Sequence, residues 1–146
     1  MSSALERDTD AAAGAADAEA ADAGLEADVF ARDCGSRDIL QNVTSRWGVL
    51  ALAALAEGDL RFSSLRRRVD GVSERMLSQT LQTLERDGFV TRTVLQSIPP
   101  KVEYSLTDLG VEAAQRLRAL IDLVQGNLAV VVEARDAYDA SHPGPR

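Results

Sequence analysis

The sequence is poor in the residues that build most catalytic and metal sites. It contains one cysteine, Cys34, and one histidine, His142. A single cysteine excludes a disulfide within the chain and a cluster of cysteine metal ligands. His142 stands beside Pro143 near the C-terminus, which is more typical of a frayed end than of a ligand. The sequence also lacks a glycine-rich phosphate loop and carboxylates paired at a recognisable spacing. We therefore predict that the protein is not an enzyme and holds no cofactor or metal.

Long apolar runs are missing as well. No stretch approaches the roughly 20 apolar residues that a membrane-spanning helix requires. The first residues are acidic, which is the reverse of the basic start of a signal peptide. These two observations predict a cytoplasmic protein that has no membrane as partner.

The negative charge of the chain is concentrated at its start. The net charge is −7, and residues 1–28 hold eight acids against one base. The other 118 residues balance 15 acids with 15 bases, and between Asp59 and Tyr104 eight bases outnumber six acids. The acidity of the whole chain therefore does not argue against a polyanionic partner, because the local sign of charge favours one.

The acidic start is rich in alanine, aspartate, glutamate and glycine and has few large apolar side chains. Such a segment cannot bury enough apolar surface to offset the entropy lost on ordering. We predict a disordered acidic tail over residues 1–32. Two alternatives stay open, namely an anionic decoy that competes with nucleic acid for a basic surface, and a start codon assigned too far upstream.

Apolar periodicity and capping residues predict mostly helices after the tail. The expected elements are helices over 37–43 and 46–57, a short extended piece at 60–62, a helix capped by Ser63 that runs through Val69, a helix between Ser73 and Gly88, strands over 89–96 and 101–106, and one long helix from Thr107 to about Tyr138. The helix over 46–57 is apolar on nearly all sides, so it should be buried at the centre. The two strands flank Pro99-Pro100, which is typical of a hairpin with a proline tip.

The helix between Ser73 and Gly88 has two different faces. Ser73 is a favourable N-cap, and Gly88 suits the left-handed conformation that often follows a helix. Leu77, Leu81 and Leu84 form one apolar stripe at helical spacing. The opposite face carries arginine, glutamine and hydroxyl side chains, which pair with base edges and phosphates. Taken alone, this polar face is also typical of an ordinary solvated helix.

The order of these elements is that of a winged helix-turn-helix. In this module one helix braces the helix that enters the major groove, and the hairpin lies along the adjacent backbone or minor groove. We predict a mainly α (α+β) fold with this domain over residues 33–106, a C-terminal dimerisation helix over 107–139 and a disordered tail over 140–146. The predicted DNA-contacting residues are Arg66, Arg67, Ser73, Arg75, Ser78, Gln79, Gln82, Thr83, Arg86 and Lys101.

The long C-terminal helix carries apolar residues at alternating spacings of four and three, the pattern of a helix that pairs with another helix. Gly110 and Gly126 would each weaken a continuous helix by about 1 kcal/mol if they lie inside it. The predicted dimerisation residues are Leu117, Ile121, Val124, Leu128 and Val131.

The stretch from Asp33 to Gly110 resembles the HxlR family of bacterial winged-helix transcription regulators. The resemblance is carried by Cys34, RWGVL at 46–50, GDLRFSSL at 58–65, VSERMLS at 72–78, LQTLERDG at 81–88 and PPKVEYSLTDLG at 99–110. The last of these, the proline-tipped hairpin and the turn into the next helix, is the most specific. The resemblance implies a homodimer with its terminal helices at the interface, bound to an inverted repeat in promoter DNA.

The chain departs from the family pattern at three places. Gly35 stands where a proline often follows the cysteine. Alanines at 51, 53 and 54 make the second predicted helix slimmer than in many members. Gln125 and Gly126 lie near the place where the last helix often carries a tryptophan.

Cys34 is a candidate sensor, because some members of the family use the equivalent cysteine to detect oxidants or electrophiles. A helix N-terminus and the nearby Arg32 and Arg37 would favour its thiolate, whereas Asp33 and Asp38 would oppose it. An unreactive cysteine is an open alternative, and so is an unknown small-molecule effector bound near the dimer helices.

The sequence therefore predicts a sequence-specific, double-stranded-DNA-binding transcription regulator that acts as a homodimeric repressor on an inverted-repeat operator. The alternative is a winged-helix module used for contacts between proteins. The arginine-rich exposed surfaces disfavour that alternative.

Overall fold

The computed structural model describes residues 28–32 and 34–145. The predicted disorder of residues 1–32 lies mostly outside the described residues and stays a prediction. The chain divides into two compact units, residues 1–45 and 46–146. The first unit contains helix α2 (Gly35–Thr44), which begins directly after Cys34. The helix therefore starts two residues before the predicted 37–43, and Ser36 lies inside its first turn.

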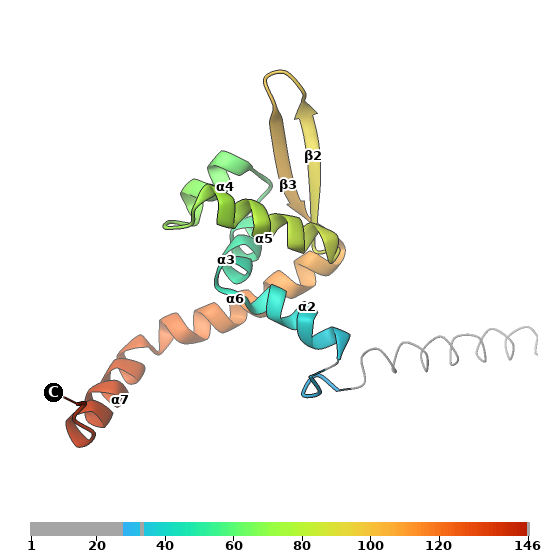
Figure 1. The fold of residues 1–146 in the computed structure, drawn as a ribbon. Helices are drawn as coiled ribbons and strands as arrows, with labels where there is room; N and C mark the ends of the chain where they lie inside the picture. Colours follow the sequence, from blue (N-terminus) through green and yellow to red (C-terminus); the bar gives the residue numbers. More distant parts are fainter. Residues whose placement is uncertain (1–27, 33, 146) are drawn as a thin grey trace, which may run out of the picture. The chain divides into compact units, whose positions relative to one another are not determined.

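The second unit has the element order of a winged helix-turn-helix (Figure 1). Its elements are α3 (Arg46–Ala56), β1 (Leu60–Arg61), α4 (Phe62–Arg68), α5 (Glu74–Arg86), β2 (Val90–Gln96), β3 (Lys101–Leu106), α6 (Asp108–Gly126) and α7 (Leu128–Ser141). The mainly α (α+β) fold class is thereby confirmed, together with the predicted hairpin.

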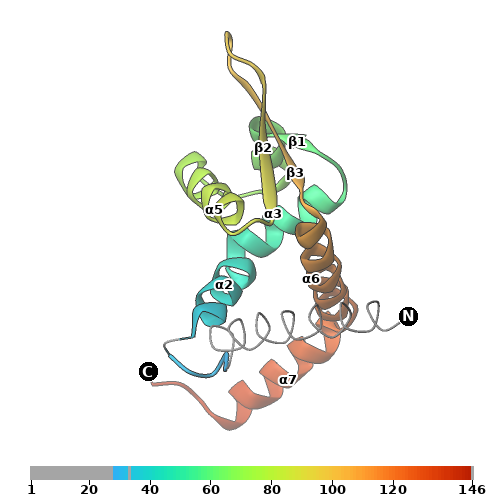
Figure 2. The ribbon, with the colours of Figure 1, turned by 90° about the vertical axis from the view of Figure 1, so that its right-hand side faces the viewer.

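Helix α3 lies at the centre of this unit, between α5 and α6 (Figure 2). Its residues from Ala51 to Leu55 are buried, as the apolar sequence predicts. The largest fully buried side chains are all leucines, contributed by α3, α4 and α5: Leu52, Leu65, Leu77, Leu81 and Leu84. The leucine stripe of α5 therefore faces the core and turns the polar side of this helix outward.

The three strands form one antiparallel sheet in the order β1-β3-β2. Leu60 pairs with Tyr104 across β1 and β3, and Val90 pairs with Leu106 across β2 and β3. Val90 and Tyr104 are buried, so the base of the hairpin is part of the core. The rest of β2 is exposed, and Figures 1 and 2 show the hairpin projecting away from the helices.

Helix α5 has the predicted ends. The Oγ of Ser73 accepts a hydrogen bond from the backbone N–H of Met76 at 3.0 Å, which satisfies one of the free donors of the first turn. At the other end Gly88 adopts a φ of +84°, the left-handed conformation that glycine tolerates without strain. The two ends of this helix that the capping residues predicted are therefore confirmed.

The long C-terminal helix was predicted as one element, and this prediction is wrong. Helix α6 ends at Gly126, α7 begins at Leu128, and Asn127 between them has φ −119° and ψ 19°. Two local causes favour a break, since glycine is a poor helix former and the Asn127 side chain donates to the Leu123 carbonyl at 2.7 Å. Helix α7 also continues to Ser141, two residues beyond the predicted end.

Gly110, which was also expected to weaken the helix, is instead required for the packing of α6. A Cβ at this position would collide with the backbone carbonyl of Phe89. Gly110 therefore lets the first turn of α6 lie directly against the segment that joins α5 to β2. Among the residues that the structure describes, no helix combines the length and the apolar character needed to cross a membrane.

Candidate nucleic-acid interface

The outer face of α5 presents the polar side chains that the sequence singled out. Arg75, Ser78, Gln79, Gln82 and Arg86 are all exposed. They lie opposite the buried leucines, so each of them can reach a partner without unfolding the core. Their donors and acceptors suit base edges and phosphate oxygens.

Two predicted contacts at this helix are more restricted. Thr83 is half-buried, which places it at the edge of the exposed face. Ser73 is exposed, but its oxygen already accepts the capping hydrogen bond from Met76. The Ser73 hydroxyl can still donate its own proton to an external acceptor.

Helix α4 adds two exposed arginines beside the start of α5. Arg66 Nη1 lies 4.0 Å from Glu74 Oε2, and Arg67 Nη2 donates to Ser64 Oγ at 3.3 Å. Both interactions are long and open to solvent, where ion pairs contribute little. The two guanidinium groups can therefore exchange these partners for a phosphate.

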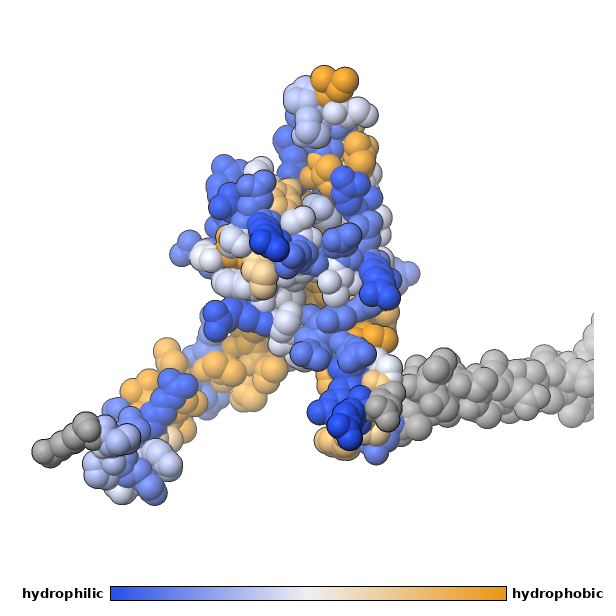
Figure 3. Space-filling model, in the orientation of Figure 1, coloured by the Kyte–Doolittle hydropathy of each residue, from blue (hydrophilic) through white to orange (hydrophobic). Residues whose placement is uncertain are grey.

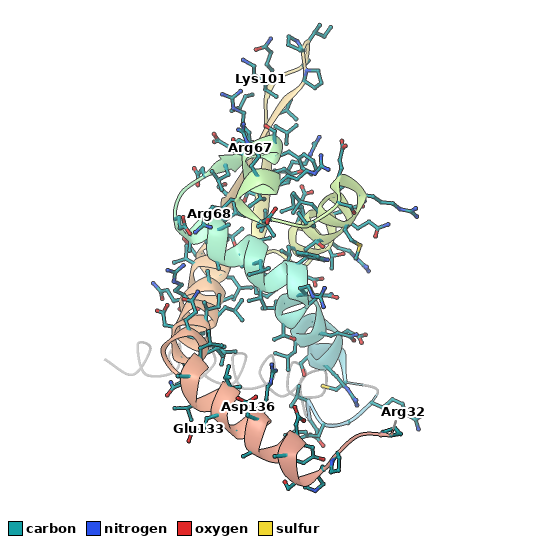
Figure 4. The ribbon with its side chains drawn as sticks, turned by 90° about the vertical axis from the view of Figure 1, so that its left-hand side faces the viewer. Arg32, Arg67, Arg68, Lys101, Glu133 and Asp136 are labelled. Atoms are coloured by element: carbon teal, nitrogen blue, oxygen red, sulfur yellow. The ribbon has the colours of Figure 1, made fainter. Side chains whose placement is uncertain are left out.

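Arg68 differs from its two neighbours, although the sequence gives all three the same appearance. Its Nη2 and Nε donate to the carboxylate of Glu57 at 2.6 and 3.2 Å. The hydrogen bond from Arg68 is the main cause that lowers the pKa of Glu57, and the same bond raises the pKa of Arg68. In the view of Figure 4, Arg67 and Lys101 lie toward the hairpin end and Arg68 lies nearer α6.

A hollow of about 680 Å³ separates the start of α4 from the start of α5. Arg66, Arg67 and Glu74 line it, together with Ser63 and Gly71. A second hollow of about 350 Å³ lies between α5 and the hairpin, where Ser78 and Gln82 meet residues of the sheet. These hollows continue the polar face of α5 toward α4 and toward the wing.

Arg92 is a candidate contact that the sequence interpretation missed. It lies on β2, pairs in register with Tyr104 and lines the same hollow as Ser78 and Gln82. Successive side chains of a strand point to opposite faces of the sheet, and this alternation was the only signal for Arg92 in the sequence. The alternation alone does not show which strand residues face α5. The register of the sheet supplies that information.

The hairpin tip carries one cation and an exposed apolar side chain. Lys101 is exposed at the first position of β3, where it pairs with Gln96. The Gln96 side chain donates to the carbonyl of Ile98 at 2.7 Å, which holds the turn together. Ile98 itself is 88% exposed.

Cys34 lies in the first unit at the N-cap of α2, and its side chain is half-buried. Its Sγ lies 2.8 Å from the Oγ of Ser36. This hydrogen bond is the main cause that lowers the pKa of Cys34, and the backbone groups of Asp28, Ser36 and Arg37 act in the same direction. The sequence interpretation attributed a reactive thiol to a helix N-terminus and to nearby arginines, and it did not consider Ser36 as a partner. The position of Cys34 at a helix N-terminus is confirmed. The Arg37 guanidinium instead donates to the Phe30 carbonyl at 3.4 Å.

The predicted dimerisation residues do not share one surface. Leu117 is only 7% exposed within the single chain, so it belongs to the core. Ile121 is half-buried, and Val124, Leu128 and Val131 are exposed on both sides of the break at Asn127. Further exposed apolar side chains are Leu109 and Val111 in the first turn of α6, and Leu120, Leu123, Val130, Val132 and Tyr138 farther along α6 and α7.

The exposed apolar side chains of these two helices, from Leu120 to Tyr138, are referred to below as the arm surface. Figure 3 shows apolar colour along α6 and α7, whereas the surface over α4 and α5 is largely hydrophilic. An exposed cluster of apolar side chains of this kind marks an interaction site more often than a free surface.

Comparison with known proteins gives one family and several close relatives. The family model for the HxlR-like helix-turn-helix matches residues 42–131. The HTH-type transcriptional regulator YtfH of Escherichia coli K12 is 53% identical over 111 residues, which cover 76% of this chain and 88% of the relative. The structure of the transcriptional regulator YtfH from Salmonella typhimurium is 51% identical, with a TM-score of 0.72 over 75% of this chain and 97% of that one. The redox regulator HypR in its reduced form is 31% identical, with a TM-score of 0.61 over 67% of this chain and 97% of that one.

Proposed function

Because the chain belongs to the HxlR-like helix-turn-helix family of DNA-binding transcription regulators, we propose that it is a homodimeric repressor that reads an inverted-repeat operator with α5. The observation that carries the proposal is the exposed polar face of α5, held outward by three buried leucines and flanked by the arginines of α4. Its site of action is the cytoplasm, where promoter DNA is accessible.

The side chains divide into two groups by their chemistry. Gln79 and Gln82 suit adenine, and Arg75 suits guanine, so α5 reads bases in the major groove. Arg66, Arg67 and Lys101 carry charge on the flanking elements, so they hold phosphates and set the position of α5. Ser73, Ser78, Thr83, Arg86 and Arg92 complete the contact surface.

The homodimer is proposed from the arm surface. A second copy that packs its own α6 and α7 there would bury side chains that the single chain leaves in water. Two-fold symmetry then presents two copies of α5 to one side of the duplex. The expected operator has two half-sites separated by about 34–36 Å, one helical turn, or by a multiple of it.

A response to oxidants through Cys34 is a second proposal, supported by the hydrogen bond from Ser36 that favours its thiolate. The name of the similar HypR describes a redox regulator. With one cysteine in this chain, any disulfide that Cys34 forms must be made between subunits or with a small thiol. A regulator with an inert Cys34 and a small-molecule effector is the competing proposal.

The proposal is tested by incubating the purified full-length protein with fragments of genomic DNA and recovering the fragments that bind. The affinity for one recovered fragment is then compared with the affinity for a scrambled version of it. We expect tighter binding to the recovered fragment and a steep loss of affinity between about 50 and 200 mM salt, because phosphate contacts release counterions. A winged-helix module used for protein contacts would bind both fragments equally weakly. That result would contradict the proposed function.

A further inference from the structure

A pocket of about 230 Å³ lies between α3, α4 and α6, away from the face of α5 that reads DNA. Its buried lining is apolar and comes from Ala53 and Ala54 of α3 and from Val69, which follows α4. Its exposed lining is mostly polar and includes Arg68 and Arg118, together with the apolar Leu50. The pocket therefore has an apolar interior and a margin that holds two arginines, Arg68 and Arg118, and two acids, Glu57 and Asp70.

The two arginines at the margin are not equally engaged. Arg68 is held by Glu57 through two hydrogen bonds of 2.6 and 3.2 Å. Arg118 has only long ion pairs, from Nη1 to Glu57 Oε1 at 3.9 Å and from Nε to Asp122 Oδ1 at 3.4 Å. A guanidinium group has five N–H donors, so Arg118 retains the capacity to bind a carboxylate directly.

The two acids at the margin balance its two arginines, so the case for an anion rests on the remaining donors of Arg118. Asp70 also lines the pocket and is exposed to solvent. Its repulsion of an anion is therefore screened by water and salt. The negative charge of Glu57 is compensated by its ion pair with Arg68, whose hydrogen bond lowers the pKa of Glu57.

The volume of the pocket restricts the size of the occupant. An engineered apolar cavity of about 150 Å³ accommodates benzene. The present pocket is larger than that, so it has room for one ring or a short branched chain together with a carboxylate. Larger side chains at Ala53 and Ala54 would fill this space.

We propose that this pocket is an effector site for a small carboxylic acid, whose carboxylate binds Arg118 and whose apolar part lies against Ala53, Ala54 and Val69. The binding itself is independent of the proposed function. Its consequence for DNA rests on that function, because the residues that line the pocket lead directly into the helix-turn-helix.

The connection to DNA is short. Arg68 ends α4, and Val69 and Asp70 begin the turn that leads to α5. A bound carboxylate draws Arg118 away from Glu57 and changes the partners of the Glu57–Arg68 pair, which joins the end of α3 to the end of α4. The position of α5 relative to α4 is then coupled to occupation of the pocket.

The site is tested on the full-length protein with benzoate as the probe, by calorimetry and by the fluorescence of Trp47. Trp47 is the only tryptophan in the sequence, and its ring reaches the turn that follows Asp70, since its Cη2 lies 3.9 Å from the position of a Cβ on Gly71. We expect saturable binding of one benzoate per chain. Benzamide, which has the same shape without the charge, should bind at least about tenfold more weakly because charge-assisted hydrogen bonds are the stronger ones.

Two variants locate the binding. Arg118→Gln removes the carboxylate partner at an exposed position and should weaken benzoate at least about tenfold. Ala53→Leu fills the apolar interior and should abolish binding, provided that circular dichroism shows a folded protein. Arg116→Gln is the matched control, because Arg116 lies on the same helix, donates only to the Glu112 carbonyl and does not line the pocket. Arg116→Gln should bind benzoate like the wild type.

The outcomes separate the site from the proposed function. No binding of benzoate, equal binding of benzamide, or equal losses in Arg118→Gln and Arg116→Gln would overturn the effector site. If benzoate binds as expected, saturating benzoate should change the affinity for the recovered operator at least about fivefold in the wild type and not in Arg118→Gln. A protein that binds benzoate but no DNA would contradict the proposed function and leave the site established.

Discussion

Gly110 at the start of α6 lies so close to Phe89 that a Cβ would collide with the Phe89 carbonyl oxygen. Two hydrogen bonds hold the same junction, since the Thr107 hydroxyl donates to the Gly88 carbonyl at 2.6 Å and accepts from the Gly110 N–H at 3.0 Å. The segment that follows α5 is thereby fixed to the beginning of α6.

The first prediction concerns this junction. Gly110→Ala should lower the free energy of unfolding by about 3 kcal/mol, at the upper end for overpacking, because the obstacle is a backbone oxygen. Gly126→Ala is the control, since nothing lies within 4 Å of a Cβ there. It should raise the free energy of unfolding by up to about 1 kcal/mol, as alanine is the better helix former. Urea denaturation measures both, and equal effects of the two changes would contradict the close approach.

The elements that depend on local rules could be predicted from the sequence. Ser73 and Gly88 delimit α5 because a cap and a left-handed glycine are local requirements. The strands of the hairpin were placed to within one residue, since Pro99-Pro100 interrupts a clear alternation. The exposure of the candidate contacts on α5 follows in the same way from the spacing of its leucines.

The features that were missed depend on tertiary contacts or on weak local preferences. Nothing in the run of three arginines shows that Arg68 alone meets Glu57, which is eleven residues away. The position of Arg92 beside α5 depends on the register of the sheet. The break at Asn127 follows from weak local preferences of Gly126 and Asn127, and it divides the arm surface between α6 and α7.

The second prediction separates base reading from phosphate binding. Gln79→Ala should relax the preference at one base pair in each half-site, at a cost of about 1–3 kcal/mol on the cognate sequence. Lys101→Ala should weaken all sequences alike and reduce the salt slope by about one. Titrations of cognate and random fragments at several salt concentrations measure both effects. Equal losses on the two fragments for Gln79→Ala would show that this residue does not read bases.

The third prediction concerns the thiol of Cys34. Ser36 donates to its thiolate and is the main cause of the lowered pKa, so Ser36→Ala should raise the pKa. Only the thiolate reacts with iodoacetamide, and the rate of alkylation should therefore rise with pH over a higher range in the variant than in the wild type. Ser97→Ala, in the exposed turn of the hairpin, should leave the profile unchanged. Superimposable profiles for Ser36→Ala and the wild type would remove Ser36 as the cause.

The same cysteine can be tested for a role in regulation. Under diamide, wild-type protein should release its operator if oxidation of Cys34 is the signal, and Cys34→Ser should not. Release by both proteins would show that the thiol is not the sensor. A small-molecule effector would then be the favoured signal.

The last prediction concerns the arm surface. Leu128→Asp introduces a charge at a position where the leucine is 59% exposed in the single chain, so the folded monomer should tolerate the substitution. In the proposed dimer the charge would be buried without a partner, and burying an unpaired charge opposes association strongly. Light scattering should therefore give the mass of one chain, whereas the wild type should give that of two. Val94→Asp, on the hairpin at 52% exposure, is the matched control and should stay dimeric. If Leu128→Asp kept the mass of the wild type, the dimer interface would have to lie elsewhere on the protein, because a buried, unpaired charge at this position would have prevented association.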